Sequence, residues 1–166
     1  MPESGSAERD RTPDFGPYCN GCFISPDALA EDVAFATELA QSVAGLHESN
    51  DSDAPFYPVA IRLRPQERPE AAVRRCAAID SSLPLRVRKV NEPASIFMSN
   101  VPVRERKNVW SADEQRRLSD ADKRLRAHST DTMIMSMEDL VHVPLLRVGR
   151  TSSGTLVGVV TVRVDT

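Results

Sequence analysis

Residues 139–164 read DLVHVPLL, RVGRTSSG and TLVGVVTVRV, and this stretch decides the fold. Two apolar runs rich in β-branched residues flank a short segment, residues 149–154, that carries Gly, Ser and Thr. Val side chains favour a pleated surface, and Gly and Ser supply turn geometry. The stretch therefore predicts a β-hairpin. Its second run begins apolar on both faces, which predicts a central strand covered on both sides.

The totals describe one ordinary globular domain. The chain has 166 residues, of which 40% are hydrophobic and 27% charged, values typical of a single folded unit. Residues 1–17 are rich in Gly, Ser, Pro and charge, so we expect a disordered tail there and one domain over 18–166. No run approaches the ~20 apolar residues needed to span a bilayer, and the N-terminus has no apolar secretory core. The expected location is cytoplasmic, without a membrane partner.

The charge pattern argues against nucleic-acid binding. Formal net charge is −3, which gives no bulk attraction to phosphate. Four arginines alternate with apolar residues in two predicted strands: Arg62, Arg64, Arg86 and Arg88. A nucleic-acid-binding sheet would interleave aromatic side chains for stacking, and none are interleaved here. We expect these arginines to form a solvated face.

An amphipathic helix is predicted over residues 26–46. Ser25 is a good N-cap, and Pro26 suits the first helical turn. Apolar side chains then recur at spacings of three and four, which gives a broad apolar stripe for packing. The stripe consists of Leu29, Val33, Ala36, Ala40 and Val43, broadened by Phe35, Leu39 and Leu46.

Further elements follow from alternation and capping. Clean alternation predicts strands at 57–65 and 83–90, and a short apolar strand is expected at 95–103. Residues 69–79 begin with Pro and continue with strong helix formers, so we expect a helix. The capping-box pattern from Ser111 to Glu114 begins a charged helix that continues to residue 128.

The hairpin also carries a family resemblance. The pattern L-x-x-V-P-L, a short Gly-containing turn, then L-x-G-V-x-x-V resembles the closing hairpin of GAF domains. Its residues are Leu140, Val143, Pro144 and Leu145, then Leu156, Gly158, Val159 and Val162. The resemblance implies an α+β fold of the GAF/PAS-like sandwich type: an antiparallel sheet with the N-terminal helix on one face and further helices and loops on the other. It would place a second strand near residues 69–79, where propensity predicts helix.

The resemblance also implies a ligand and a partner. A small-molecule pocket can lie over the sheet, and the expected lining residues are Phe97, Asn100, Trp110, Met133, Met135 and His142. The Met residues could equally be core filler, and His142 a structural histidine. Many family members add a closing helix after the last strand, whereas this sequence ends two residues after Val164. The apolar stripe of the N-terminal helix would then be uncovered. We therefore expect a homodimer that buries the stripe through Leu29, Val33, Ala36, Ala40 and Val43. No motif selects a cofactor.

Cys19 and Cys22 form a C-x-x-C motif. Such a motif can supply half of a zinc site or a redox pair, but no second C-x-x-C completes a ligand set. An inert turn is the third reading. Cys76 is the remaining cysteine.

Three classes of function follow. The first is a stand-alone regulatory or sensory domain that binds a small molecule or a partner protein. The second is an interaction scaffold that has lost its pocket. The third is a cysteine-dependent redox enzyme that resembles the free methionine sulfoxide reductase branch of the same family, although no cysteine falls in residues 96–143, where that chemistry would be expected. No catalytic residue is assigned.

Overall fold

The structure is a computed structural model that describes residues 21–46, 55–140 and 142–164. The expected tail at 1–17 lies outside these residues. Within these residues, five strands form one antiparallel sheet: β1 (Tyr57–Arg62), β2 (Leu85–Lys89), β3 (Thr130–Met137), β4 (His142–Arg150) and β5 (Thr155–Val164). The helical elements are α2 (Ala30–Ser42), α3 (Pro69–Cys76), η1 (Val103–Glu105), α4 (Arg106–Val109) and α5 (Ala112–His128). The predicted α+β class is confirmed.

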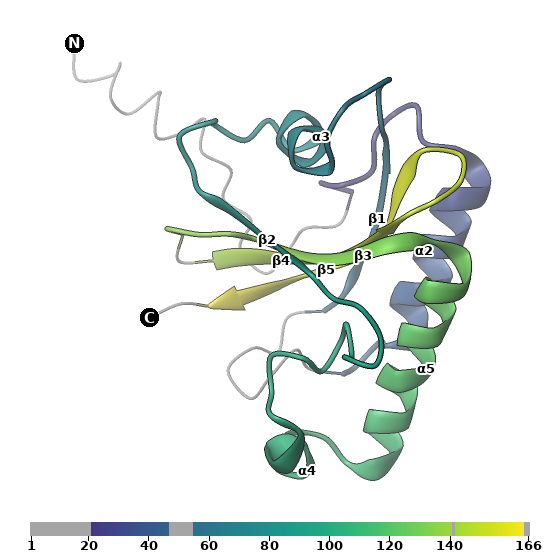
Figure 1. Cartoon of the computed structure of the whole chain (residues 1–166), viewed down its shortest axis with the longest axis vertical. Helices are drawn as coiled ribbons and strands as arrows, with labels where there is room; N and C mark the ends of the chain where they lie inside the picture. Colours follow the sequence, from purple (N-terminus) through teal and green to yellow (C-terminus); the bar gives the residue numbers. More distant parts are fainter. Residues whose placement is uncertain (1–20, 47–54, 141, 165–166) are drawn as a thin grey trace.

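The sheet has strand order β1-β5-β4-β3-β2 and separates two layers. In Figure 1, α3 lies above the sheet, whereas α2, α5 and α4 lie beside and below it. We name the two sides by their helices. The α3 face packs a cluster that includes Phe23, Val59, Ile61, Val73, Met133, Met135, Met137, Leu146, Leu156 and Val160. The α5 face packs a cluster that includes Leu39, Val43, Phe97, Trp110, Leu118, Leu125, Ile134, Leu145, Val157 and Val159.

The predicted hairpin is confirmed and occupies the centre of the sheet. β4 and β5 pair along their length, from His142 with Val164 to Arg150 with Leu156. The turn between them places Gly154 at φ 83°, a left-handed conformation that glycine adopts without steric cost. At Gly158, a Cβ atom would collide with the β4 backbone at the Arg147 carbonyl and at Val148, so close strand approach requires glycine there.

The N-terminal helix begins later than its sequence pattern predicts. α2 starts at Ala30 with Leu29 at the N-cap, and Ser25 does not cap it. Instead, the Ser25 N–H donates to the Ala60 carbonyl at 2.9 Å, and the Ser25 hydroxyl accepts from the Arg62 N–H at 2.9 Å. The serine is used to attach the chain to β1, because a buried edge of that strand offers polar groups that need partners.

The apolar stripe of α2 packs inside its own chain. Ala36, Ala40 and Val43 are buried, while Leu29 and Val33 are half-buried. α2 contacts β1, β5 and α5. An uncovered stripe was the reason for expecting a homodimer through this helix, and the chain's own sheet removes that reason.

One strand prediction is confirmed and one is wrong. The strand predicted at 83–90 is β2, although its side chains are largely exposed, including Val87 at 38%. Residues 95–103 form turns and the start of η1 rather than a strand, although Ile96, Phe97 and Met98 are buried as their apolar character requires. Their backbone N–H groups bond to a side chain of α5, as set out below.

Both helices predicted after β1 are confirmed. α3 has Pro69 at its first turn, and the capping box of α5 joins Ser111 and Glu114 in both directions, at 3.1 Å and 2.9 Å. Neither they nor any other helix in the described residues combines the length and apolar character that a bilayer crossing needs.

Candidate ligand-binding site

An open hollow of about 460 Å³ lies on the α5 face, over β2, β3, β4 and β5. Ile134 and Leu145 supply apolar surface, and Ser136 and Asn100 supply polar groups. Sites for small molecules commonly have volumes of roughly 300–1,000 Å³ and combine apolar walls with a few polar groups. The hollow therefore has the size and the mixed lining of a metabolite site.

Strand register explains which side chains reach the hollow. Ile134 pairs with Arg88 of β2 and with Arg147 of β4, and Ser136 pairs with Arg86. Directly opposite residues of antiparallel strands share a face. The arginines that alternate along β2 therefore lie on the same side as Arg147. The packing of α2 against β1 and β5 leaves the β2 side of this face to the hollow.

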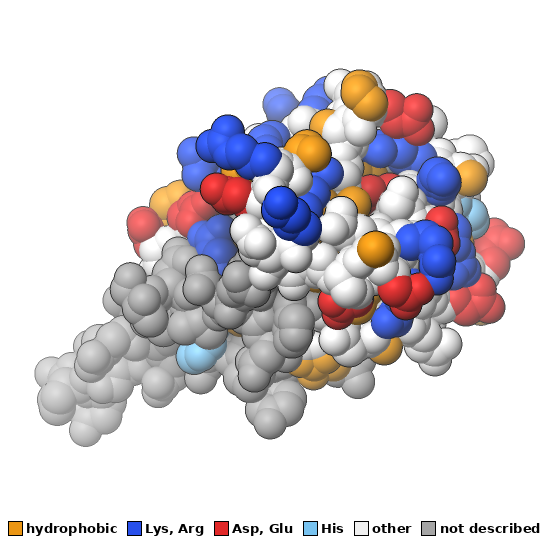
Figure 2. Space-filling model, turned by 90° about the horizontal axis from the view of Figure 1, so that it is seen from below, with side chains coloured by type: hydrophobic (Ala, Val, Ile, Leu, Met, Phe, Trp, Pro, Cys, Tyr) orange, Lys and Arg blue, Asp and Glu red, His pale blue; other side chains and the backbone are white. Residues whose placement is uncertain are grey.

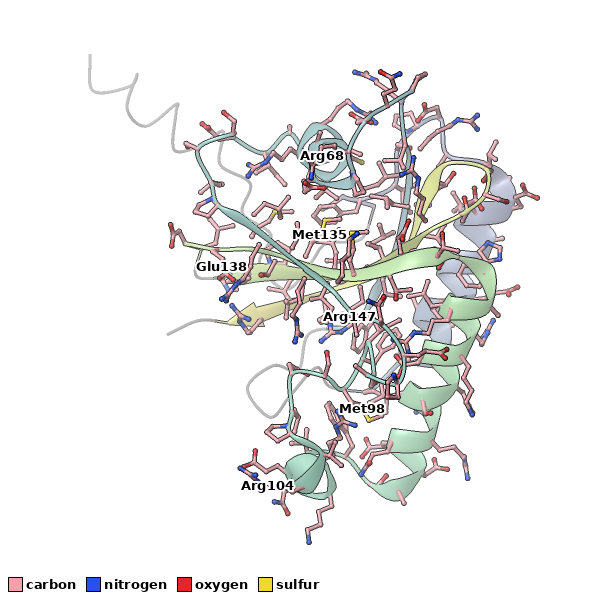
Figure 3. All side chains as sticks on the ribbon, in the orientation of Figure 1. Arg68, Met98, Arg104, Met135, Glu138 and Arg147 are labelled. Atoms are coloured by element: carbon pink, nitrogen blue, oxygen red, sulfur yellow. The ribbon has the colours of Figure 1, made fainter. Side chains whose placement is uncertain are left out.

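Arg147 lies at the centre of the sheet and is 1% exposed. Its Nε–H donates to the Ile96 carbonyl at 3.0 Å, and its guanidinium lies 5.9 Å from the centroid of the Phe97 ring. Figure 3 shows Arg147 on the lower side of the sheet and Met135 on the upper side. A buried guanidinium needs hydrogen bonds to offset desolvation, and the segment at Ile96 supplies one.

Asp122 of α5 fixes that segment. Its carboxylate accepts hydrogen bonds from the Ile96 and Phe97 N–H groups at 3.0 Å each and from the Ser95 hydroxyl at 2.5 Å. Burial raises the pKa of Asp122 above its ordinary value, against the lowering effect of these three hydrogen bonds. The result is a continuous hydrogen-bonded connection from α5 through Ile96 to Arg147.

Glu138 stands at another part of the lining. Its carboxylate accepts from the Ser136 hydroxyl at 2.9 Å and from Arg163 at 3.5 Å, and it lies 3.9 Å from Arg86. Arg88 contributes at the rim, where it donates to the Ser99 hydroxyl at 3.2 Å. The hollow thus already holds one carboxylate among its arginines.

The six residues predicted to line a pocket lie in different parts of the structure. Asn100 lines the hollow. Phe97 and Trp110 are buried in the core of the α5 face. Met133 and Met135 pack on the opposite face, because alternation along β3 sends Met and Ile134 to different sides. His142 begins β4 and is half-buried there.

Strand order decides which of the four strand arginines reach the hollow. Arg86 and Arg88 are solvent-exposed, as predicted, but they do not lie beside Arg62 and Arg64, because β1 and β2 are opposite edges of the sheet. Only strand order separates the two pairs and brings one of them next to Arg147. Viewed from below in Figure 2, Lys and Arg side chains are interspersed with Asp and Glu, and no continuous basic face appears in that view.

The described cysteines lie away from the hollow. Cys22 and Cys76 pack against the cluster of the α3 face, and the Cys76 thiol lies 3.8 Å from the Cys22 carbonyl. Burial raises the pKa of the Cys76 thiol, which disfavours the nucleophilic thiolate. Cys19 lies outside the described residues. Within those residues, no group of three or more His, Cys, Asp or Glu side chains could hold a metal ion.

A second, smaller hollow of about 340 Å³ lies on the other side of β2. Basic and acidic side chains are mixed in its lining, which includes Arg68, Glu70, Lys89, Asp131 and Arg150. It offers a natural comparison for tests of charge selectivity.

Comparison of the chain with family models and with curated proteins finds no match. Function must therefore be argued from the geometry of the hollow.

Proposed function

We propose that the chain is a regulatory module that binds a small molecule in the hollow on the α5 face. The observation that carries the proposal is the buried Arg147, held by the Ile96 carbonyl beside an open, partly apolar hollow. Burying a guanidinium is costly, and a fold that fixes one beneath a cavity gives that cavity a positive potential that favours an anionic ligand.

The GAF resemblance gives this proposal limited support. The antiparallel sheet and the closing hairpin agree with what the resemblance implies. Two features depart from it: α3 stands where a second strand was implied, and the hollow shares its face with α2, whereas the resemblance implied opposite faces. The proposal therefore rests on the hollow, and membership of the family remains a proposal.

The redox-enzyme alternative receives no comparable support. The described cysteines pack on the α3 face, so the sheet separates them from a ligand in the hollow. The hollow is formed by residues of one chain, so the proposal requires no second subunit.

The proposal can be tested by thermal-shift screening of the full chain against a metabolite library. A ligand that binds the folded state raises the melting temperature, and the rise grows with the ratio of ligand concentration to dissociation constant. Ser136→Phe would place a ring in the hollow and should abolish the shift, while Ser81→Phe, on an exposed loop, should preserve it. A screen without hits, or a hit that Ser136→Phe leaves unchanged, would contradict the proposal and favour the scaffold hypothesis.

A further inference from the structure

The charge of the hollow limits what it can bind. Its lining contains four arginines, Arg86, Arg88, Arg147 and Arg163, and one carboxylate, that of Glu138. Arginine presents a planar fork of donors that matches carboxylate and phosphate oxygens. The local excess of positive charge stands out in a chain whose formal net charge is −3. A small molecule in this hollow is therefore expected to be anionic.

Glu138 indicates where one anionic group would bind. Its carboxylate contacts Ser136, Arg163 and Arg86. The side chain of Glu138 is 25% exposed, and that of Arg163 is 32% exposed, so a ligand can reach this position from solvent. A ligand carboxylate or phosphate could accept from the same donors, since it presents the same oxygen geometry. Glu138 thus marks one oxyanion position and competes for it.

Arg88 marks a second position, because its side chain is exposed, whereas the buried Arg147 adds positive charge beneath it. The two arginines flank Ile134 across the sheet, and Arg163 pairs with Val143, four residues before Arg147 on β4. Arg88 and Arg147 thus lie in one row across the sheet, and Arg163 lies in another. At a rise of ~3.3 Å per residue, the Cα atoms of these two rows are roughly 13 Å apart along the strand. The stems of Arg88 and Arg163 can bend and so shorten the gap between their guanidinium groups, but one small anion cannot contact both positions at once.

From these two positions, and on the basis of the function proposed above, we propose that the ligand carries two oxyanion groups, carboxylate or phosphate, joined by a spacer. One group contacts the exposed Arg88 above the buried Arg147, and the other displaces Glu138 from Arg86 and Arg163. Ile134 and Leu145 contact the spacer. Glu138 is accordingly a specificity residue: it excludes ligands whose second group cannot displace it.

The first test is calorimetric titration of the full chain with dicarboxylates of increasing length. Affinity should rise from malonate through glutarate to adipate, because only a longer spacer allows both groups to bind. The neutral diamide of adipate should bind far more weakly. Fructose 1,6-bisphosphate serves as the phosphate probe, and its affinity relative to adipate assigns the oxyanion to phosphate or carboxylate. Equal affinity for malonate, inorganic phosphate and adipate would overturn the two-position arrangement.

The second test uses three variants and the tightest probe. Glu138→Gln removes the competing charge and should tighten binding by ~3- to 10-fold, whereas Arg163→Gln should weaken it by about tenfold. Arg163 is partly exposed, so this change should leave the fold intact. Arg150→Gln removes the same charge from the second hollow and should leave affinity unchanged. Unchanged affinity in Glu138→Gln and Arg163→Gln, or a loss in Arg150→Gln, would overturn the proposal.

The experiments distinguish an error in the dianion inference from an error in the proposed ligand-binding function. If a neutral compound from the library binds and Ser136→Phe abolishes its binding, while no dianion binds, the hollow is a ligand site and the dianion inference is wrong. If neither class of compound binds, both the function and the inference are wrong.

Discussion

The two faces of the sheet differ in how completely apolar side chains and helices cover them. On the α3 face, aliphatic and Met side chains from β1, β3, β4 and β5 pack against α3 and residues near Phe23. On the α5 face, helices cover part of the sheet, and the remainder bears Arg147 and an open hollow. The difference indicates that packing on the α3 face contributes mainly to the stability of the fold. The α5 face has less apolar packing where it carries charged groups.

Neighbouring residues on β4 give the strongest test of this contrast. Leu146 is fully buried in the α3 face, and Leu145 borders the hollow. Leu146→Ala should lower the free energy of unfolding by about 3–4 kcal/mol, because it removes apolar contacts and leaves a cavity. Leu145→Ala should cost less, about 2 kcal/mol, since the hollow already adjoins its side chain. Urea denaturation measures both, and equal losses would contradict the contrast.

Removing Asp122 should have the next largest effect. Asp122→Ala leaves the buried Ile96 and Phe97 N–H groups without their acceptor, at a cost of about 2–3 kcal/mol in unfolding free energy. Asp122→Asn should cost less, because its amide oxygen can still accept from both groups.

The same pair of variants tests the connection to the hollow. Asp122→Ala should weaken ligand binding more than Asp122→Asn, since Ile96 positions Arg147. If both variants bind the ligand with the affinity of the unchanged chain, the connection does not position Arg147.

The rim of the α3 face should respond to acid. Arg75 donates to both carboxylate oxygens of Glu67, at 2.9 Å and 2.8 Å, and this pairing lowers the pKa of Glu67 from an ordinary 4.5 to about 2. A lowered carboxyl pKa stabilises the fold fully above pH 4.5, and the contribution is lost as pH falls through 2.

The difference in melting temperature between the unchanged chain and Glu67→Gln should therefore be largest at neutral pH and shrink between pH 4.5 and 2. We expect the difference at neutral pH to be smaller than the effect of Asp122→Ala, because this pair lies nearer the solvent. A difference that stays constant over that interval would show that the ion pair does not stabilise this face.

The smallest effect is expected at the α5 capping box. Ser111→Ala removes one of its two reciprocal bonds and should lower the free energy of unfolding by about 1 kcal/mol. Ser111→Asp, which keeps an acceptor at the N-cap, should restore most of that loss. Because the N-cap lies outside the hollow's lining, ligand affinity should stay the same in both variants.

Local signals in the sequence were sufficient for much of the fold. The hairpin, α3 and the capping box of α5 follow from alternation, propensity and spacing within a few residues. Residues 95–103 were misread as a strand because their apolar character matches a buried strand. Their hydrogen-bond acceptor, Asp122, lies 25 or more residues away, and no local pattern reveals it.

The candidate site was less accessible to sequence reasoning for the same reason. Arg86 and Arg88 are solvent-exposed, as their alternation predicts, but alternation assigns a face and not a neighbouring strand. Strand order places them beside β3 and in line with Arg147. Met133 and Met135 were expected to line the pocket, but they lie on the α3 face, and the hollow lies on the other face. Which face holds the hollow depends on how the helices pack, and alternation along one strand does not reveal that.

The central claim is that a ligand binds on the α5 face beside Arg147. Two-dimensional NMR of the ¹⁵N-labelled full chain, titrated with adipate, tests it most directly. We predict saturable shifts at the Arg147 side-chain N–H and at backbone amides of residues 86–88, 134–136 and 145–147. Shifts confined to the α3 face, such as residues 59–61 and 72–73, or no saturable shift with adipate or with any compound found in the thermal-shift screen, would contradict the claim.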